Sequence, residues 1–129
     1  MEKFFLDTPK QGFIDVTARV GEAIGHGPVQ NGICTVFIPH TTAGVTINEN
    51  ADPDVVCDMM SALDNMVPDL PYRHGEGNSR AHVKSSLLGC SVTLPVENRR
   101  LALGRWQGIY LCEFDGPRRR NVWVQLVGN

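Results

Sequence analysis

Histidine, carboxylate and amide side chains gather in four stretches of the sequence, and these residue types transfer protons or hold ligands. His40 follows a strand-like apolar run and Pro39, so a rigid sheet would position its imidazole beside the flexible Ala43 and Gly44. The alternative is a histidine that is only hydrogen-bonded within a turn. His40 is therefore a catalytic candidate with a structural alternative.

The second stretch places Asn48, Glu49 and Asp52 between a predicted strand and a predicted helix. Asp52 has a structural role as the N-cap of that helix, whereas Glu49 has none. A carboxylate at a strand end orients a histidine or acts as a general base, and the neighbouring helix N-terminus attracts anions. Glu49 is therefore a second catalytic candidate.

The densest stretch contains His74, Glu76 and Asn78 interleaved with glycines, followed by His82 in the first turn of a predicted helix. Glycines let the backbone approach a ligand closely, and the helix dipole favours neutral imidazole at His82. Neutral imidazole accepts a proton or binds a metal. One hypothesis is that His40, His74 and His82 hold a divalent ion and leave one position open.

The fourth stretch runs from Gln107 to the arginines at 118–120. Strand alternation places Glu113 and Asp115 on one face, where they form with Arg118 either a turn salt bridge or a clamp for phosphate or carboxylate. The arginines at 118–120 lack interleaved aromatics, so they do not predict nucleic-acid binding. The residues therefore leave two alternatives open for this stretch, an ordinary turn salt bridge and a small-anion site.

The bulk composition is that of an ordinary globular domain. The chain has 129 residues, 42% of them hydrophobic and 20% charged, with a formal net charge of −2. This charge gives no global attraction to nucleic acid or to an anionic membrane. The first residues lack the apolar stretch of a signal peptide, and no 18-residue apolar run occurs. We expect one cytoplasmic domain over residues 1–129, with no membrane partner.

Strands outnumber helices in the predicted elements, and the two do not alternate regularly. We expect strands over 3–8, 13–16, 33–38, 45–48, 88–96, 109–114 and 122–127. The continuous apolar run at 33–38 is typical of a strand buried on both faces. The strands at 109–114 and 122–127 flank a turn at 115–118, which favours a final hairpin. The pattern predicts an α+β fold with mostly antiparallel sheets.

Two to three short helices complete the prediction. Thr17 is expected to cap a weak helix that ends by the Gly and Pro residues at 25–28. The clearest helix has Asp52 as N-cap, Pro53 at its first position and Pro68 beyond its end, with an apolar face from Val55 to Met66. A third helix is predicted over residues 79–87.

Four motifs closely resemble the YjbQ family, an uncharacterised protein family. These are HTTAGVTINENADPDV at 40–55, GNSRAH at 77–82, LGRWQGIYL at 103–111 and EFDGPR at 113–118. They occur in the family's order, and the likeness covers nearly the whole chain. The sequence departs from the family pattern at Asn98, where a turn glycine is common, and at Arg105, where threonine is usual.

The resemblance implies a small α+β domain with a β-sandwich, assembled as a homotrimer, with polar pockets associated with the subunit interfaces. By this resemblance, nine polar residues are expected to line the pockets: His40, Asn48, Glu49, Asp52, Asn78, His82, Gln107, Glu113 and Arg118. Within this set, Glu113 joins the catalytic candidates, and Asn48, Asp52, Asn78, Gln107 and Arg118 are the ligand-binding candidates. It also implies a weak, secondary thiamine-phosphate-synthase-type activity.

Three functions remain open from the sequence. The first is an enzyme acting on a phosphorylated small metabolite. In this scheme Arg118 and a helix N-terminus would hold the anion. His40 or His82 would transfer a proton, and Glu49 or Glu113 would orient that histidine. Mg²⁺ is a candidate cofactor there, because it neutralises a diphosphate leaving group. The others are a non-catalytic metabolite- or metal-binding module, and a metal-dependent hydrolase that uses Zn²⁺ or a similar ion held by His40, His74 and His82.

Overall fold

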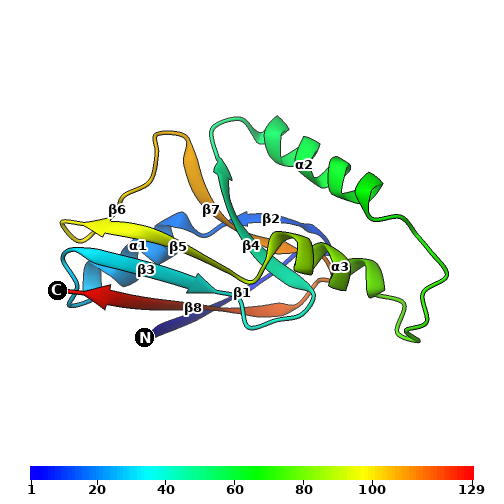
Figure 1. The fold of residues 1–129 in the computed structure, drawn as a ribbon, viewed down its shortest axis with the longest axis horizontal. Coiled ribbons are helices and arrows are strands. Elements are labelled where there is room, and N and C mark those ends of the chain that lie inside the picture. The colour runs from blue at the N-terminus through cyan, green and yellow to red at the C-terminus, as the bar shows by residue number, and fades with distance from the viewer.

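A computed structural model describes residues 1–129, and its strands form two antiparallel sheets (Figure 1). The larger sheet contains, in spatial order, β1 (Glu2–Asp7), β8 (Arg119–Gly128), β3 (Gly32–Phe37), β5 (Ser91–Glu97) and β6 (Arg100–Leu101). The smaller sheet contains β2 (Gly12–Asp15), β7 (Gln107–Glu113) and β4 (Ala43–Glu49). The helices are α1 (Thr17–His26), α2 (Pro53–Met66) and α3 (Ser79–Leu88). The α+β, antiparallel class predicted from the sequence is confirmed.

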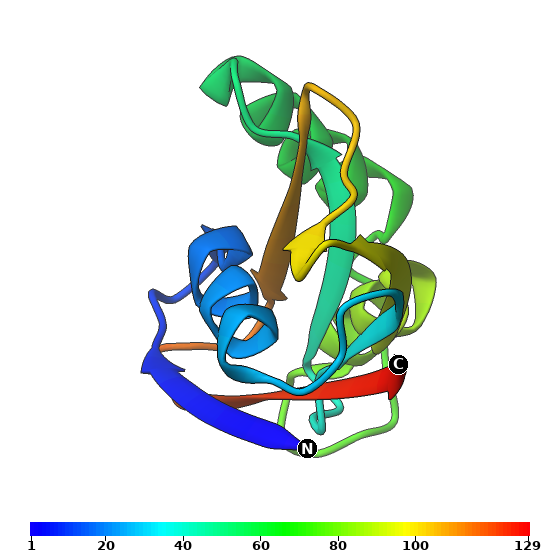
Figure 2. The same ribbon diagram turned by 90° about the vertical axis from the view of Figure 1, so that its left-hand side faces the viewer.

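The main core lies between the two sheets, with α1 packed beside them (Figure 2). It contains 16 buried hydrophobic residues, drawn from both sheets and from α1. Val20, Ala23 and Ile24 are the buried residues of α1, and their spacing of three and one places them on one helical face. Burial of this face stabilises α1, because its two glycines, Gly21 and Gly25, lower its intrinsic helix propensity.

A second, smaller core lies on the opposite face of the three-stranded sheet. Leu63 of α2 and Ala81 of α3 cover Tyr110, Cys112 and Phe114 there. Residues 108–114, the last six residues of β7 and the residue after it, are therefore all buried. Alternate side chains of this strand enter the two different cores.

The prediction that residues 33–38 are buried on both faces is wrong. In β3, Cys34 and Val36 are fully buried, whereas Ile33 is 46% exposed and Phe37 is 37% exposed. Only the inner face of the five-stranded sheet meets the core, so the outer face of β3 is left open. β7 is the strand that is covered on both sides.

The predicted final hairpin is also wrong. β7 pairs with β2 and β4, whereas β8 pairs with β1 and β3 in the other sheet. The turn at 115–118 therefore crosses from one sheet to the other. Short separation along the chain favoured a hairpin, but the pairing partners come from segments far away in sequence.

The helix termini follow local chemistry, with one exception. Asp52 is the N-cap of α2 and its Oδ1 accepts a hydrogen bond from the Asp54 N–H at 2.9 Å, as predicted. Thr17 is not the N-cap of α1. It lies inside the helix, and its N–H donates to Asp15 Oδ1 at 2.9 Å. None of the three helices is both long enough and apolar enough to span a membrane.

The short strand β6 was not predicted, and it pairs with β5 through a two-residue turn. Both turn residues have positive φ, 51° at Asn98 and 61° at Arg99. This is the geometry of a type I′ hairpin turn, which asparagine tolerates well. Asn98 therefore adopts the left-handed backbone expected where relatives carry glycine. The predicted strand at 88–96 begins later, at Ser91, because Leu88 ends α3.

Candidate functional site

A polar pocket of about 470 Å³ lies where the chain crosses between the sheets. None of its ten lining residues is hydrophobic. Four residues that follow β3 contribute to it, Pro39, His40, Thr41 and Thr42. The segment before α3 supplies His74, Glu76 and Asn78, α3 supplies His82, and the start of β8 supplies Arg118 and Arg120. Five residues predicted from the sequence therefore converge here: His40, His74, Asn78, His82 and Arg118.

His40 is fixed to the backbone of β8. Its Nε2 accepts a hydrogen bond from the Asn121 N–H at 2.8 Å. A nitrogen that accepts is unprotonated, so in the neutral ring the proton is on Nδ1. Burial lowers the pKa of His40, and the nearby Arg120 lowers it further. His40 is therefore a neutral imidazole whose Nδ1–H is the group available for a ligand.

Arg120 is held beneath the pocket by a fully buried carboxylate. Arg120 Nε donates to Glu113 Oε1 at 2.7 Å, and Arg120 Nη2 donates to Glu113 Oε2 at 2.5 Å. Thr8 Oγ1 also donates to Glu113, while Thr42 Oγ1 accepts from Arg120 at 2.9 Å. Burial raises the pKa of Glu113, but the hydrogen bonds from Arg120, Thr8 and the Asp115 N–H outweigh it and leave the pKa below its ordinary value.

This network changes the expected role of Glu113. Its side chain is 0% exposed, and both oxygens accept hydrogen bonds from within the chain. Glu113 therefore positions Arg120 instead of meeting a ligand. The bidentate pair also joins the end of β7 to the start of β8, so it connects the two sheets.

Arg118 is oriented by the turn that carries it. Its Nε donates to the Asp115 carbonyl oxygen at 2.7 Å, and its Nη2 donates to Asp115 Oδ2 at 3.0 Å. The same carboxylate oxygen accepts from Asn78 Nδ2 at 2.9 Å. The hydrogen bond from Asn78 and the contacts with Arg118 hold the pKa of Asp115 below its ordinary value. Arg118 is half exposed, and its Nη1 makes none of these hydrogen bonds and is available to a ligand.

Helix α3 begins beside the pocket, and Asn78 and His82 are among the lining residues. Asn78 is the N-cap, but its side chain makes no hydrogen bond to the first N–H groups of the helix. These groups carry the positive end of the helix dipole. His82 follows one turn later, and its ring lies 5.7 Å from that of His74 in an edge-to-face arrangement. The pocket therefore combines two arginines and three imidazoles.

The three histidines do not form a metal site within one chain. No three His, Cys, Asp or Glu side chains are grouped closely enough to hold a metal ion. His40 in addition uses its Nε2 lone pair on Asn121 and has its proton on Nδ1. The predicted ligand set of His40, His74 and His82 therefore does not fit Zn²⁺ or Mg²⁺, although all three side chains line one pocket.

The remaining predicted residues lie at the opposite end of β4 and β7. Ala43 pairs with Glu113 at the pocket end, while Glu49 pairs with Gln107 at the other end. Six residues of strand separate the two ends by about 20 Å. Asn48, Glu49, Asp52 and Gln107 are therefore not brought to the polar pocket of the same chain.

At that far end, these side chains bond to their own backbone. Asn48 Oδ1 accepts from the Glu49 N–H at 2.7 Å, and Gln107 Oε1 accepts from the Gly104 N–H at 2.7 Å. Glu49 Oε2 accepts from the Asp52 N–H at 3.3 Å. Arg105 also belongs to this end, where its guanidinium lies 5.0 Å from the Trp106 ring. The unusual Arg105 therefore does not face the polar pocket.

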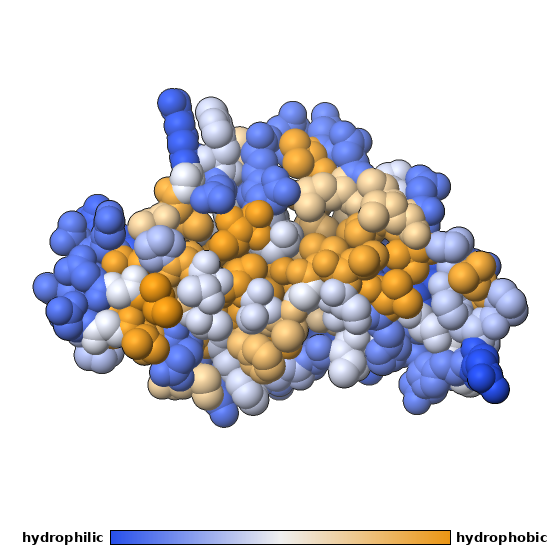
Figure 3. Space-filling model, viewed as in Figure 1, coloured by the Kyte–Doolittle hydropathy of each residue, from blue (hydrophilic) through white to orange (hydrophobic).

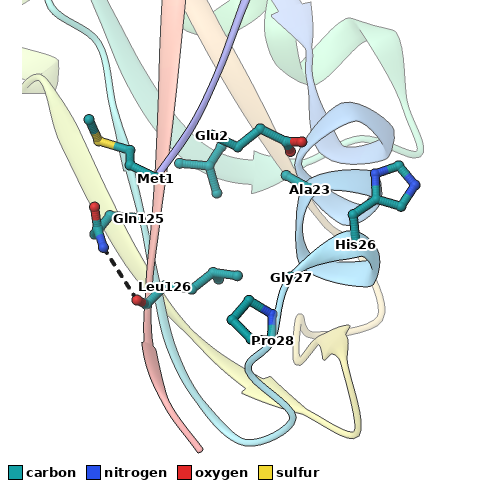
Figure 4. A pocket seen from close by; sticks show the side chains of 9 residues that line it. Met1, Glu2, Ala23, His26, Gly27, Pro28, Gln125 and Leu126 are labelled. Carbon is teal, nitrogen blue, oxygen red and sulfur yellow. Dashed lines mark hydrogen bonds between the residues drawn. The ribbon is translucent and has the colours of Figure 1, made fainter.

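A second hollow, of about 340 Å³, lies between the start of β1, the end of α1 and β8 (Figure 4). Its walls mix Leu126, Ala23 and Pro28 with the carboxylate of Glu2 and the imidazole of His26. It contains no arginine or lysine and no buried polar network. The charged pocket at the sheet crossing is therefore the better candidate for a functional site.

Sequence reasoning missed the buried partners beneath the pocket, Arg120, Thr8 and Thr42. A signal for Arg120 was present, because it shares the strand period of two with Val122 and Val124, which are both buried. An arginine on the inner face of a strand needs a buried partner. No comparable signal identified Thr8, which meets Glu113 from 105 residues away.

Comparisons with known proteins agree with this architecture. The family model described as UPF0047 protein YjbQ-like matches residues 2–129. UPF0047 protein MJ1081 of Methanocaldococcus jannaschii is 46% identical, over 98% of this chain and 94% of its own length. UPF0047 protein YugU of Bacillus subtilis is 48% identical, over 94% of this chain and 93% of its own length.

Solved structures share the whole fold. A YjbQ/UPF0047-family protein from Clostridium acetobutylicum superimposes with a TM-score of 0.95 at 50% identity, covering 98% of this chain and 100% of that one. A YbjQ-like protein of unknown function from Sulfolobus solfataricus has a TM-score of 0.93 at 28% identity, covering 99% and 96% of the two chains. With its four motifs, its two-sheet fold and these relatives, the chain belongs to the YjbQ-like UPF0047 family.

Proposed function

We propose that this protein is an enzyme acting on a phosphorylated small metabolite, and that the polar pocket holds the phosphate. One observation carries the proposal: Arg118 and Arg120 converge with three histidines on a pocket that no hydrophobic residue lines. Guanidinium groups are donors that recognise phosphate in proteins.

The residues divide into those that bind and those that position. Arg118 Nη1 and the His40 Nδ1–H donate to phosphate oxygens, while Glu113 and Thr42 hold Arg120 in place. His82 lines the pocket without a hydrogen bond to the backbone or to a carboxylate, so it is the imidazole free to transfer a proton. His40 is a donor in this scheme and His82 is the acid or base.

The reaction implied by the family resemblance, release of diphosphate from a pyrimidine methyl diphosphate, would use the same anion contacts. Within one chain, however, no hydrophobic residue lines the pocket to pack against a pyrimidine ring. The anion contacts thus support phosphate chemistry in general, and the thiamine-phosphate-synthase-type reaction is one proposal within that class.

Binding of inorganic phosphate by the intact protein tests the anion site. Arg118→Ala removes a charged donor and should weaken phosphate binding by about 10- to 100-fold, since a hydrogen bond to a charged group contributes roughly 1.5–3 kcal/mol. Arg119→Ala is the matched control, because the Arg119 guanidinium lies over the Phe5 ring outside the pocket. Calorimetric titration measures both, and equal affinity in the two variants would refute the anion site.

Catalysis is tested separately at His82. His82→Ala should abolish release of phosphate or diphosphate from a panel of phosphorylated metabolites while the protein still binds inorganic phosphate. Turnover equal to that of the wild type would remove His82 from the mechanism. Binding of the panel without any product, in both proteins, would instead favour a non-catalytic metabolite-binding module.

We further propose that the protein works as a homotrimer, the assembly that the family resemblance implies. Exposed apolar side chains on α2 and α3 support this proposal. Met66 is 66% exposed, Leu87 is 55% exposed and Val83 is 40% exposed. In Figure 3, hydrophobic side chains gather over α3 and extend towards α2. A second copy covering this surface would bury these apolar side chains.

A further inference from the structure

We infer that the organic part of the ligand is a hydroxylated chain, as in a polyol or sugar phosphate, and not a heteroaromatic ring. The inference rests on the proposed phosphate site and names its substrate class. It starts from the groups that line the pocket beyond the cations.

The pocket offers hydrogen-bond acceptors in addition to its phosphate donors. Glu76 contributes a carboxylate whose side chain is 75% exposed, and Thr41 and Thr42 contribute hydroxyl groups. Asn78 Oδ1 is buried and has no hydrogen-bond partner in the chain, because the amide is oriented by its Nδ2 donating to Asp115. A buried acceptor of this kind is normally satisfied, so it predicts a donor on the bound molecule or on a water that comes with it.

Hydroxyl groups meet both requirements. Each one donates to a carboxylate or an amide oxygen and accepts from a threonine or histidine donor. A ligand with phosphate at one end and hydroxyls along its chain would therefore pair its phosphate with Arg118, and its hydroxyls with the neighbouring Asn78 and with Glu76.

An aromatic ring fits these walls poorly. It would remove water from carboxylate, amide and hydroxyl groups without replacing their hydrogen bonds, which costs roughly 1–3 kcal/mol for each buried group. Pockets for aromatic ligands are lined mostly by hydrophobic and aromatic side chains. Here the ring-bearing residues are histidines, and none of the ten lining residues is hydrophobic.

Three phosphate esters separate these possibilities. Propyl phosphate and glycerol 1-phosphate have the same carbon chain and differ by two hydroxyl groups, and phenyl phosphate supplies a ring. We expect the intact protein to bind glycerol 1-phosphate at least about 10-fold more tightly than propyl phosphate, since each added hydrogen bond contributes roughly 0.5–1.5 kcal/mol. Phenyl phosphate should bind no more tightly than propyl phosphate. Competition against a common phosphate probe, followed by NMR, gives the three affinities.

Glu76→Gln tests the acceptor side. It should reduce the affinity ratio of glycerol 1-phosphate to propyl phosphate by several-fold, because an uncharged acceptor binds a hydroxyl less strongly. Glu97→Gln is the matched control, since Glu97 is an exposed carboxylate on β5 outside the pocket and should leave the ratio unchanged.

The outcomes distinguish the two proposals. If the esters bind and Arg118→Ala weakens them all, but the hydroxylated ester has no advantage or the phenyl ester binds best, the polyol inference is wrong and the phosphate site stands. If no ester binds, or if Arg118→Ala changes nothing, the phosphate site itself is wrong.

Discussion

Single hydrogen bonds decide what the pocket residues are able to do. The Asn121 N–H occupies Nε2 of His40, and this removes His40 both from metal binding and from service as a base through that nitrogen. Glu113 is likewise committed to Arg120. Two residues that the sequence marks as catalytic are therefore, in the structure, a donor and a positioning group.

The lowered pKa of His40 predicts a pH-dependent stability. Because its folded-state pKa lies below the ordinary value of 6.5, the unfolded chain binds a proton more readily than the folded one as pH falls through that range. The contribution of neutral His40 to the free energy of unfolding is thus complete above pH 6.5 and is lost as the pH drops towards the folded-state pKa. Urea unfolding at pH 7 and pH 5 should show a smaller loss for His40→Gln, which keeps an acceptor but does not titrate. An equal loss in both proteins would count against this assignment.

At the scale of elements, α2 is attached to the rest of the chain chiefly at its C-terminal end. Leu63 is its only buried residue. Next to it, Asp64 accepts from the buried Lys84 of α3, and Arg80 donates to the carbonyl oxygens of Val67 at 2.8 Å and Asp64 at 3.0 Å. The hydrogen bond from Lys84 lowers the pKa of Asp64. This cluster, Asp64, Arg80 and Lys84, joins α2 to α3.

Asp64→Asn should therefore loosen α2. The substitution leaves the Lys84 ammonium, whose side chain is 3% exposed, without its charged partner, and we expect a loss of about 1–3 kcal/mol. Asp58→Asn, an exposed position on the same helix, is the control. Urea unfolding measures the loss, and hydrogen exchange should show α2 amides exchanging faster in Asp64→Asn alone. If both variants behave alike, the cluster does not anchor the helix.

Elements were predictable from sequence where their signals are local. The N-cap at Asp52 and the start of α2 were correct because capping depends on two or three neighbouring residues. The partners of β7 and of β8 were not predictable, because each strand pairs with residues 58 or more positions away, as Val45 and Leu111 or Phe4 and Val122 illustrate. The site divides in the same way: residue types indicated an anion pocket, but only the crossing between the sheets brings His40 to Arg118.

At the scale of the whole molecule, the exposed apolar surface of α2 and α3 predicts the assembly interface. Leu87→Glu should convert the proposed trimer to monomers, because it introduces a charge where a second copy would bury a leucine. Leu70→Glu is a matched control, since Leu70 lies in a loop and is 54% exposed, against 55% for Leu87. Light scattering after size-exclusion chromatography reports the mass. A trimer that survives Leu87→Glu would place the interface elsewhere.

The position of β8 has a consequence for how the chain is made. β8 is the last strand in sequence, yet it lies between β1 and β3 and is the sole neighbour of β1 (Figure 1). Until residues 119–128 have left the ribosome, the first strand has no partner and the five-stranded sheet is divided. Folding of the larger sheet, and of the pocket that Arg118 and Arg120 complete, must therefore wait until residues 119–128 have been synthesised and released.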